Sequence, residues 1–118
     1  MISLHPHRHW SAIALASGLC VAPVWAGEAP RGERFFTERH GREWACATCH
    51  GAVPSGEGKH AVTGKPIAPL APAFNAQRLT DPAKTEKWFR RNCNDVVGRE
   101  CNAAEKADLL AWLLTLKP

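Results

Sequence analysis

The clearest hydrophobic pattern in the chain lies near its C-terminus. Apolar side chains recur there at the spacing of one helical face: Leu109, Trp112, Leu113 and Leu116. Asn102 and Glu105 precede them with the three-residue spacing of a capping box, which is typical of a helix start. The pattern predicts a helix that begins near Asn102 and runs almost to the end of the chain.

A second helix is predicted after Asp81 and Pro82, which suit an N-cap and the first helical position. One face of this helix carries two aromatic and two polar side chains at helical spacing: Thr85, Trp88, Phe89 and Asn92. A basic face lies beside it, formed by Lys84, Lys87 and Arg91. The sequence places an amide, Asn92, among otherwise mostly apolar neighbours.

A short N-terminal helix is predicted from Gly32 to Arg39, with Phe35 and Phe36 on one side and Gly41 ending it. The segment 51–75 is rich in glycine and proline, and this composition predicts a long structured loop. Pro66, Pro69 and Pro72 are spaced three apart, which suits a polyproline-like conformation. Strand patterns are absent. The predicted fold is all-α with one long loop.

The first 26 residues have the pattern of a cleavable export signal. Arg8 precedes an apolar run from Ala12 to Ala26, and Val24-Trp25-Ala26 forms a small-x-small cleavage site. A membrane anchor is the alternative, but the run is short for a span of about 20 residues and Pro23 interrupts it. We therefore expect a signal peptide at 1–26, one periplasmic domain at 27–118 and no stable membrane insertion after cleavage.

Charge and cysteine content narrow the possible functions. Loss of Arg8 with the signal lowers the formal net charge from +4 to +3, which is too slight an excess to indicate nucleic-acid binding. Four cysteines remain in the domain: Cys46, Cys49, Cys93 and Cys101. In an oxidising compartment Cys93 and Cys101 could pair and close a small loop, and free thiols are the alternative.

The first cysteine pair stands in Cys46-Ala47-Thr48-Cys49-His50, the C-x-x-C-H signature of covalent haem attachment. The two thiols add to the two vinyl groups of the haem, and His50 binds the iron. A thioredoxin-like pair would need a βαβ context. A four-cysteine zinc site would need the second pair two to four residues apart, whereas seven residues separate Cys93 from Cys101. We predict one covalently bound haem c.

The ligand on the opposite side of the iron is not the usual methionine, because the only methionine is Met1. The remaining candidates are two histidines, two lysines, one amide or no ligand at all: His40, His60, Lys59, Lys65 and Asn92. An amide pointing into an apolar pocket needs a partner, and an iron would provide one. A helix C-cap is the other ordinary role of an asparagine at this point.

The chain resembles small class I-like cytochromes c. The resemblance implies a fold in which the N-terminal and C-terminal helices cross, with Gly32 and Phe36 facing Trp112 and Leu113. It also implies that the carbonyl of Pro69 accepts the ring N–H of His50 and so fixes its tautomer. Pro69 and Trp88 are accordingly expected to lie against the haem.

A closer resemblance rests on TGKPIAPLAP, RLTD, EKWFRRNCNDVVGREC and EKADLLAWL, together with CATCH. These segments resemble the SHP-type cytochromes c, a family of high-spin monohaem proteins, over nearly all of 63–116. The resemblance implies iron ligation by His50 and Asn92 and a disulfide between Cys93 and Cys101. It further implies transient binding of O2, binding of NO, and a dihaem cytochrome c as redox partner.

The expected function is a redox-gated gas site. A neutral amide oxygen suits hard ferric iron better than ferrous iron, so Asn92 is expected to leave on reduction and admit O2, NO or CO. The alternative is a plain electron carrier with a bis-histidine or otherwise closed iron. No general base or second substrate pocket is apparent, so no enzymatic reaction is assigned. Lys84, Lys87 and Arg91 are a candidate docking face for an acidic donor, or simply a solvated helix face.

Overall fold

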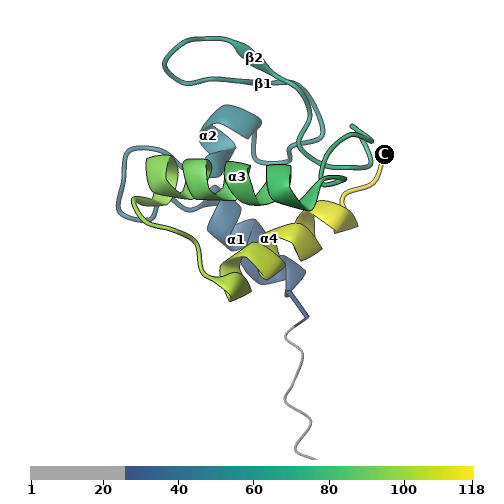
Figure 1. The fold of residues 1–118 in the computed structure, drawn as a ribbon. Coiled ribbons are helices and arrows are strands. Elements are labelled where there is room, and N and C mark those ends of the chain that lie inside the picture. The colour runs from purple at the N-terminus through teal and green to yellow at the C-terminus, as the bar shows by residue number, and fades with distance from the viewer. Residues whose placement is uncertain (1–25) are drawn as a thin grey trace, which may run out of the picture.

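The computed structural model describes residues 26–118. Their regular elements, in chain order, are α1 (Ala29–Thr37), α2 (Cys46–His50), β1 (Gly58–Lys59), β2 (Pro66–Ile67), α3 (Pro82–Asn92), the π-helix η1 (Cys93–Val97) and α4 (Ala103–Thr115) (Figure 1). The predicted all-α class is confirmed except for one two-stranded hairpin. The predicted signal peptide lies outside the described residues apart from Ala26, and no helix within 26–118 is long and apolar enough to cross a bilayer.

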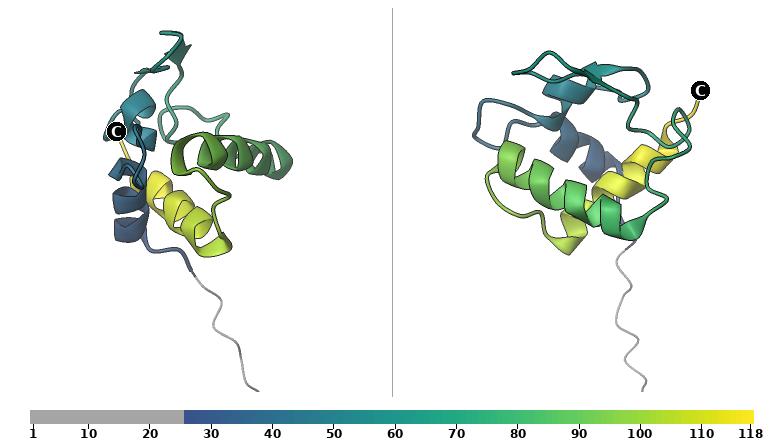
Figure 2. Two further views of the ribbon diagram at one scale, coloured as in Figure 1. Left: turned by 90° about the vertical axis from the view of Figure 1, so that its left-hand side faces the viewer. Right: turned by 45° about the horizontal axis from the view of Figure 1, so that its top comes forward.

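Helices α1 and α4 pack against each other and supply the main apolar core (Figures 1 and 2). Gly32 makes the close approach possible, because a Cβ atom at this position would lie 2.0 Å from the carbonyl oxygen of Asp108. Phe36 packs on Trp112 with the ring centroids 4.9 Å apart, and both side chains are buried. The predicted crossing is confirmed, although Gly32 meets Asp108 and Leu109 rather than Trp112.

A buried carboxylate ties the two helices at the crossing. Asp108 accepts hydrogen bonds from the Glu28 backbone N–H, at 2.6 Å, and from the Arg31 Nε atom, at 2.9 Å. The guanidinium of Arg31, followed by the Glu28 N–H, lowers the pKa of Asp108. The crossing therefore combines apolar packing with a satisfied buried charge.

The bounds of α1 differ from the prediction, which placed the helix at 32–39 and its end at Gly41. The helix begins at Ala29 because Pro30 suits the first turn, where a missing N–H costs nothing. It ends at Thr37, and Glu38 already has extended backbone angles. The helix therefore ends before Gly41, which lies in the turn that follows.

The long loop contains a short antiparallel hairpin in which Gly58 pairs with Ile67 and Lys59 with Pro66. The prediction that strands are absent was wrong here, because pairs of two residues are too short to produce an alternating pattern. Farther along, the backbone N–H groups of Leu70 and Ala71 both donate to the carbonyl of the buried Pro54. The loop is thus folded back on itself and on α2.

The starts of α3 and α4 match the predictions. The Asp81 side chain accepts a hydrogen bond from the Lys84 N–H at 3.1 Å. Asn102 and Glu105 form a reciprocal capping box with bonds of 2.9 and 2.8 Å. At its other end α3 continues without interruption into η1, so Asn92 keeps helical angles of −68° and −38° and is not a left-handed C-cap.

Candidate haem site

The three residues of the attachment motif lie on one short helix, α2. Its first turn is fixed by the buried Ala45, whose N–H donates to the Thr48 hydroxyl at 3.0 Å and whose carbonyl accepts from the Thr48 N–H. Cys46 and Cys49 are both free thiols of intermediate exposure. The helix therefore presents two unpaired thiols and an adjacent imidazole.

The ionisation of these groups suits haem binding. Burial, followed by the positive charge of Arg78, lowers the pKa of His50, so the imidazole is neutral at pH 7 and has a lone pair for a metal. Burial raises the pKa of the Cys46 thiol to about 11. Cys46 is therefore a protonated thiol that does not behave as an exposed redox-active cysteine.

The helix of the attachment motif, α2, rests on the α1–α4 core. The rings of Phe36 and His50 have centroids 6.1 Å apart, and Phe36 contacts Trp112 on its other side. Cys46 and Ala47 also pack against this core. The rigid crossing of α1 and α4 thus positions α2.

The carbonyl of Pro69 is engaged by other donors than the one we expected. It accepts hydrogen bonds from the Arg78 Nε atom at 3.0 Å and from the Asn75 Nδ2 atom at 3.3 Å. No bond between His50 and Pro69 is present among the described residues, so the expected link is not formed here. Arg78 also donates to the Ala68 carbonyl at 2.9 Å, so its guanidinium binds two successive carbonyls of this loop. This role of Arg78 was not predicted, because no spacing pattern in the sequence indicates it.

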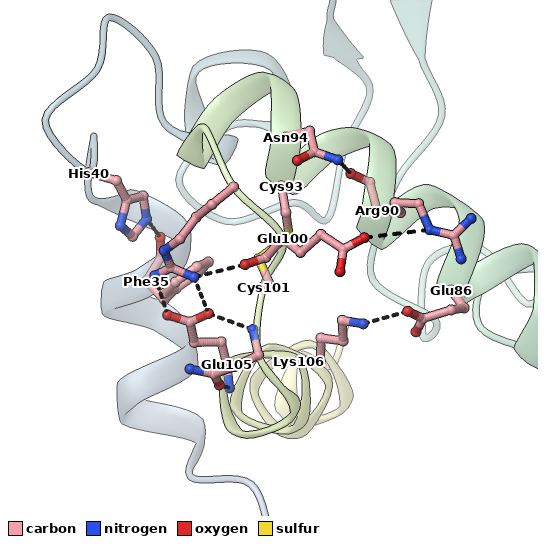
Figure 3. Close-up of a disulfide and its surroundings, with 12 residues drawn as sticks. Phe35, His40, Glu86, Arg90, Cys93, Asn94, Glu100, Cys101, Glu105 and Lys106 are labelled. Atoms are coloured by element: carbon pink, nitrogen blue, oxygen red, sulfur yellow. Dashed lines mark hydrogen bonds and ion pairs between the residues drawn. A yellow bond between two sulfur atoms is a disulfide. The ribbon is translucent and has the colours of Figure 1, made fainter.

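Asn92 is the last residue of α3, and its exposed side chain makes no hydrogen bond with any residue in 26–118. Asn94 behaves differently, since its Nδ2 atom donates to the Arg90 carbonyl at 2.9 Å (Figure 3). Of the two asparagines that flank Cys93, Asn92 alone therefore has an unused amide. It stands where the α-helix widens into a π-turn, a feature that is frequent at functional sites.

Trp88 lies one helical turn before Asn92 and is 42% exposed. The guanidinium of Arg91 sits 5.5 Å from the centre of its ring, and Arg91 also approaches Asp95 at 3.9 Å. Phe89 is the residue of this stretch that packs inward, against both the α1–α4 core and the disulfide cluster. The predicted face of α3 is therefore only partly buried, through Phe89 and Thr85.

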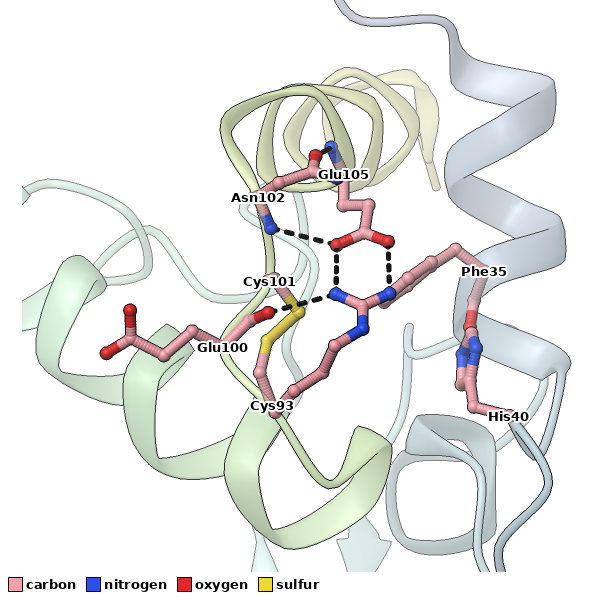
Figure 4. Close-up of polar contacts among 8 residues, drawn as sticks. Phe35, His40, Cys93, Glu100, Cys101, Asn102 and Glu105 are labelled. Carbon is pink, nitrogen blue, oxygen red and sulfur yellow. Dashed lines mark hydrogen bonds and ion pairs between the residues drawn. A yellow bond between two sulfur atoms is a disulfide. The ribbon is translucent and has the colours of Figure 1, made fainter.

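Cys93 and Cys101 form a disulfide with Cα atoms 5.7 Å apart (Figures 3 and 4). Both cysteines are buried, and Phe35 and Phe89 pack against them, so the bridge also joins α1 to α3. The disulfide follows Asn92 directly. It limits how far the end of α3 can move.

A bidentate ion pair closes the same segment. Arg99 donates to both carboxylate oxygens of Glu105, at 2.7 and 2.9 Å, and Glu105 also accepts from the Asn102 N–H (Figure 4). The Arg99 hydrogen bond is the main cause that lowers the pKa of Glu105. The sequence revealed Glu105 as a capping residue, but its pairing with Arg99 depends on how the loop folds.

The two candidate histidines, His40 and His60, have structural roles. The Nε2 atom of His40 lies 2.7 Å from the Phe35 carbonyl, and its ring packs on the Phe35 ring. His60 accepts hydrogen bonds at Nδ1 from the Val62 and Thr63 N–H groups, which places it in the hairpin turn. Each imidazole therefore already uses one ring nitrogen in a contact with backbone.

The side chains present fit haem c and do not fit a bare metal ion. Within residues 26–118 no three histidine, cysteine, aspartate or glutamate side chains converge in a way that could hold one. The second cysteine pair is oxidised, which excludes zinc binding by all four cysteines. Two free thiols with C-x-x-C-H spacing and a neutral imidazole are the groups that covalent haem attachment requires.

Comparison with known proteins agrees with this assignment. Residues 23–113 match the model of a domain of unknown function, DUF1924. The cytochrome c-type protein SHP of Cereibacter sphaeroides is 47% identical over 107 residues, which cover 87% of this chain and 82% of that protein.

Two solved structures are also similar. The structure of oxidised SHP, described as an oxygen-binding cytochrome c, has 47% identity and a TM-score of 0.71, covering 76% of this chain and 83% of its own. The solution structure of cytochrome c'' from Methylophilus methylotrophus, described as giving insights into haem-ligand detachment, has 43% identity and a TM-score of 0.69, covering 78% and 77%. On this evidence the chain belongs to the DUF1924 family and is a monohaem cytochrome c of the SHP type, with one covalently bound haem c.

Proposed function

We propose that this cytochrome is a redox-gated site for O2, NO or CO, with His50 on one side of the iron and Asn92 on the other. The observation that carries the proposal is the unused amide of Asn92, which ends α3 and is followed directly by the disulfide. Asn94, His40 and His60 are each occupied by contacts with backbone. The description of SHP as oxygen binding and of cytochrome c'' in terms of ligand detachment supports the same reading.

The haem, when bound, supplies an iron that changes oxidation state and binds diatomic gases when ferrous. The side chains of the protein determine which other groups can bind the iron. Asn92 offers a neutral oxygen, a hard and weak ligand that suits the ferric state and gains little from the ferrous state. After it leaves, its NH2 group can donate a hydrogen bond to an incoming gas.

The distal segment, residues 92–102, is built for a small and reversible movement. The Cys93–Cys101 disulfide and the Arg99–Glu105 pair hold its ends, while the Asn92 side chain is exposed. A ligand tethered in this way can leave the metal without unfolding α3. Trp88 and Pro69 are proposed to lie against the haem when it is bound.

The proposed setting is the periplasm, reached through the signal peptide at 1–26, with a dihaem cytochrome c as the electron donor. A bis-histidine electron carrier remains the competing function. It would require His60 to give up the hydrogen bonds at its Nδ1 atom, whereas His40 could bind through Nδ1 while Nε2 keeps its contact with the Phe35 carbonyl.

The decisive experiment compares electronic spectra of the holoprotein in both oxidation states, with and without CO, for the native protein, Asn92→Ala and Asn94→Ala. Asn92→Ala is expected to change the ferric spectrum, because an iron ligand is lost, whereas Asn94→Ala is expected to leave it unchanged. CO is expected to change the spectrum of all three reduced proteins. A reduced native spectrum that CO does not alter would contradict the gas site, and a spectral change in His40→Ala or His60→Ala alone would favour the carrier.

A further inference from the structure

We propose that an acidic one-electron donor protein docks on the hairpin surface, which we define as Lys59, His60, Val62 and Lys65. This inference rests on one part of the proposed function, namely that a partner protein donates the electron that reduces the haem. It places the docking site over the haem-bearing cysteine Cys49. The basic face of α3 suggested by the sequence is then not the docking site.

The first observation is direct contact between the hairpin and Cys49. The backbone N–H of Ala61 donates to the Cys49 sulfur at 3.4 Å. Gly58 packs so closely on the same residue that a Cβ atom there would lie 2.2 Å from the Cys49 carbonyl oxygen. Figure 1 shows the hairpin lying beside α2.

This contact matters because Cys49 is one of the two cysteines that bind the haem covalently. The rate of electron transfer falls off steeply with distance. A donor therefore gains most by docking on exposed residues that contact the haem attachment point. The hairpin meets this condition through Ala61. No hydrogen bond or ion pair joins Lys84 or Lys87 to α2 in the described part of the chain.

The second observation is that the turn of the hairpin is both exposed and well fixed. Val62, which lies in this turn, is 68% exposed. The His60 ring accepts two hydrogen bonds from the turn, from Val62 and Thr63, and the His60 N–H donates to the Lys65 carbonyl at 2.9 Å. A preformed surface of this kind loses little conformational entropy when a partner binds.

The third observation is charge. Lys59 and Lys65 are exposed on the two sides of the turn, and neither forms an ion pair with another residue in 26–118. On α3, Arg91 is already shared between Asp95 and the Trp88 ring, whereas Lys84 and Lys87 are unpaired within 26–118 like the two hairpin lysines, so contact with Cys49 is what distinguishes the hairpin. Two free cations beside an exposed valine complement a partner that carries carboxylates around a small apolar centre.

The reaction at this surface is a simple electron transfer. The donor, a reduced flavin or haem protein, loses one electron, and the ferric haem gains it. No covalent bond forms or breaks in the step. Donor and acceptor then separate.

The test uses the native holoprotein and two matched charge reversals, Lys59→Glu/Lys65→Glu and Lys84→Glu/Lys87→Glu. Reduced flavodoxin serves as the acidic donor, and reduction is followed by stopped flow at several salt concentrations. The hairpin variant is expected to react about tenfold more slowly at low salt, with the difference vanishing at high salt, because steering by charge is screened. The α3 variant is expected to stay within about twofold of native.

A binding measurement without turnover complements the rates. Oxidised flavodoxin added to 15N-labelled ferric protein is expected to shift the amide signals of Ala61 and Val62 and to leave those of Lys84 and Lys87 in place. Rates that fall for the α3 variant but not for the hairpin variant would overturn the proposal. So would rates that are independent of salt in all three proteins.

Two controls distinguish this proposal from the gas-site proposal and from self-association of the protein. Both variants are expected to bind CO like the native protein after reduction by dithionite, so a loss of CO binding throughout would refute the gas site and leave the docking result standing. Sedimentation of native protein and Val62→Asp tests a second copy as the occupant. Self-association of the native protein that Val62→Asp abolishes would assign the surface to a dimer and overturn the proposal.

Discussion

The crossing of α1 and α4 and the distal segment are held together in different ways. At the crossing Gly32 lets two backbones touch, and Phe36 and Trp112 fill the space beside it with 2% and 4% exposure. In the distal segment Asn92 is exposed, and one disulfide and one ion pair supplement a small buried cluster of Cys93, Val97 and Cys101. The first region is fixed by the packing of two helices, and the second is held mainly by a cross-link beside a much smaller cluster.

This difference separates the two halves of the proposed iron coordination. His50 belongs to the packed region, because its helix rests on Phe36 and the α1–α4 core. Asn92 belongs to the restrained region. A ligand that must remain in both oxidation states is therefore placed on the rigid side, and the ligand proposed to leave is placed on the side where a small movement costs little.

The largest expected effect distinguishes the two regions by a matched pair of tryptophans. Trp112→Ala removes a buried ring and is expected to lower the free energy of unfolding by about 3–5 kcal/mol. Trp88→Ala removes a ring that the polypeptide itself leaves 42% exposed, so it is expected to cost less than Trp112→Ala even though the ring is proposed to lie against the haem. Denaturant unfolding of the holoproteins measures both, and equal losses would show that the distal side is packed as firmly as the crossing.

The next effect tests the restraint itself. Cys93→Ser/Cys101→Ser removes the cross-link from a short loop and is expected to cost about 2–3 kcal/mol. The helical circular dichroism signal is expected to persist, because the α1–α4 core does not need the bridge. The ferric absorption spectrum is expected to shift toward that of Asn92→Ala. A double variant with native stability and a native ferric spectrum would show that the disulfide does not restrain the distal ligand.

The smallest effect concerns pH at the crossing. Arg31, followed by the Glu28 N–H, holds the pKa of Asp108 below its ordinary value. A lowered carboxyl pKa stabilises the fold above the ordinary value of about 3.9, and this stability is lost as the pH falls through the lowered folded-state pKa. Asp108→Asn is therefore expected to be less stable than native at pH 7, and the gap is expected to narrow below about pH 4. A gap that is constant between pH 3 and 7 would contradict a charged role for Asp108.

Arg31→Gln is the control for this measurement. If the Arg31–Asp108 contact causes the effect, the double variant is expected to lose less stability than the sum of the two single variants. Strict additivity would place the cause elsewhere, in the bond from the Glu28 N–H.

Much of the fold follows from local signals in the sequence. The starts of α3 and α4 were predicted correctly because Asp81-Pro82 and the Asn102–Glu105 pair act on their own helices, within one turn. The start of α1 at Ala29 and the hairpin of Gly58 were predicted wrongly, because a proline in the first turn and pairs of two residues leave little pattern. The π-turn after Asn92 also has no signature that could be recognised in the sequence.

The sequence by itself determined the covalent chemistry: two thiols and an imidazole in C-x-x-C-H, without a methionine in the domain for the other side of the iron. Only the tertiary structure decided which polar groups are already engaged. It showed that Arg78 and Asn75 occupy the Pro69 carbonyl, that the Asn94 amide is bonded while that of Asn92 is not, and that Ala61 donates to the Cys49 sulfur. The reason is physical: covalent reactivity depends on residue type and near spacing, whereas a hydrogen bond between distant segments exists only once the chain has brought donor and acceptor together.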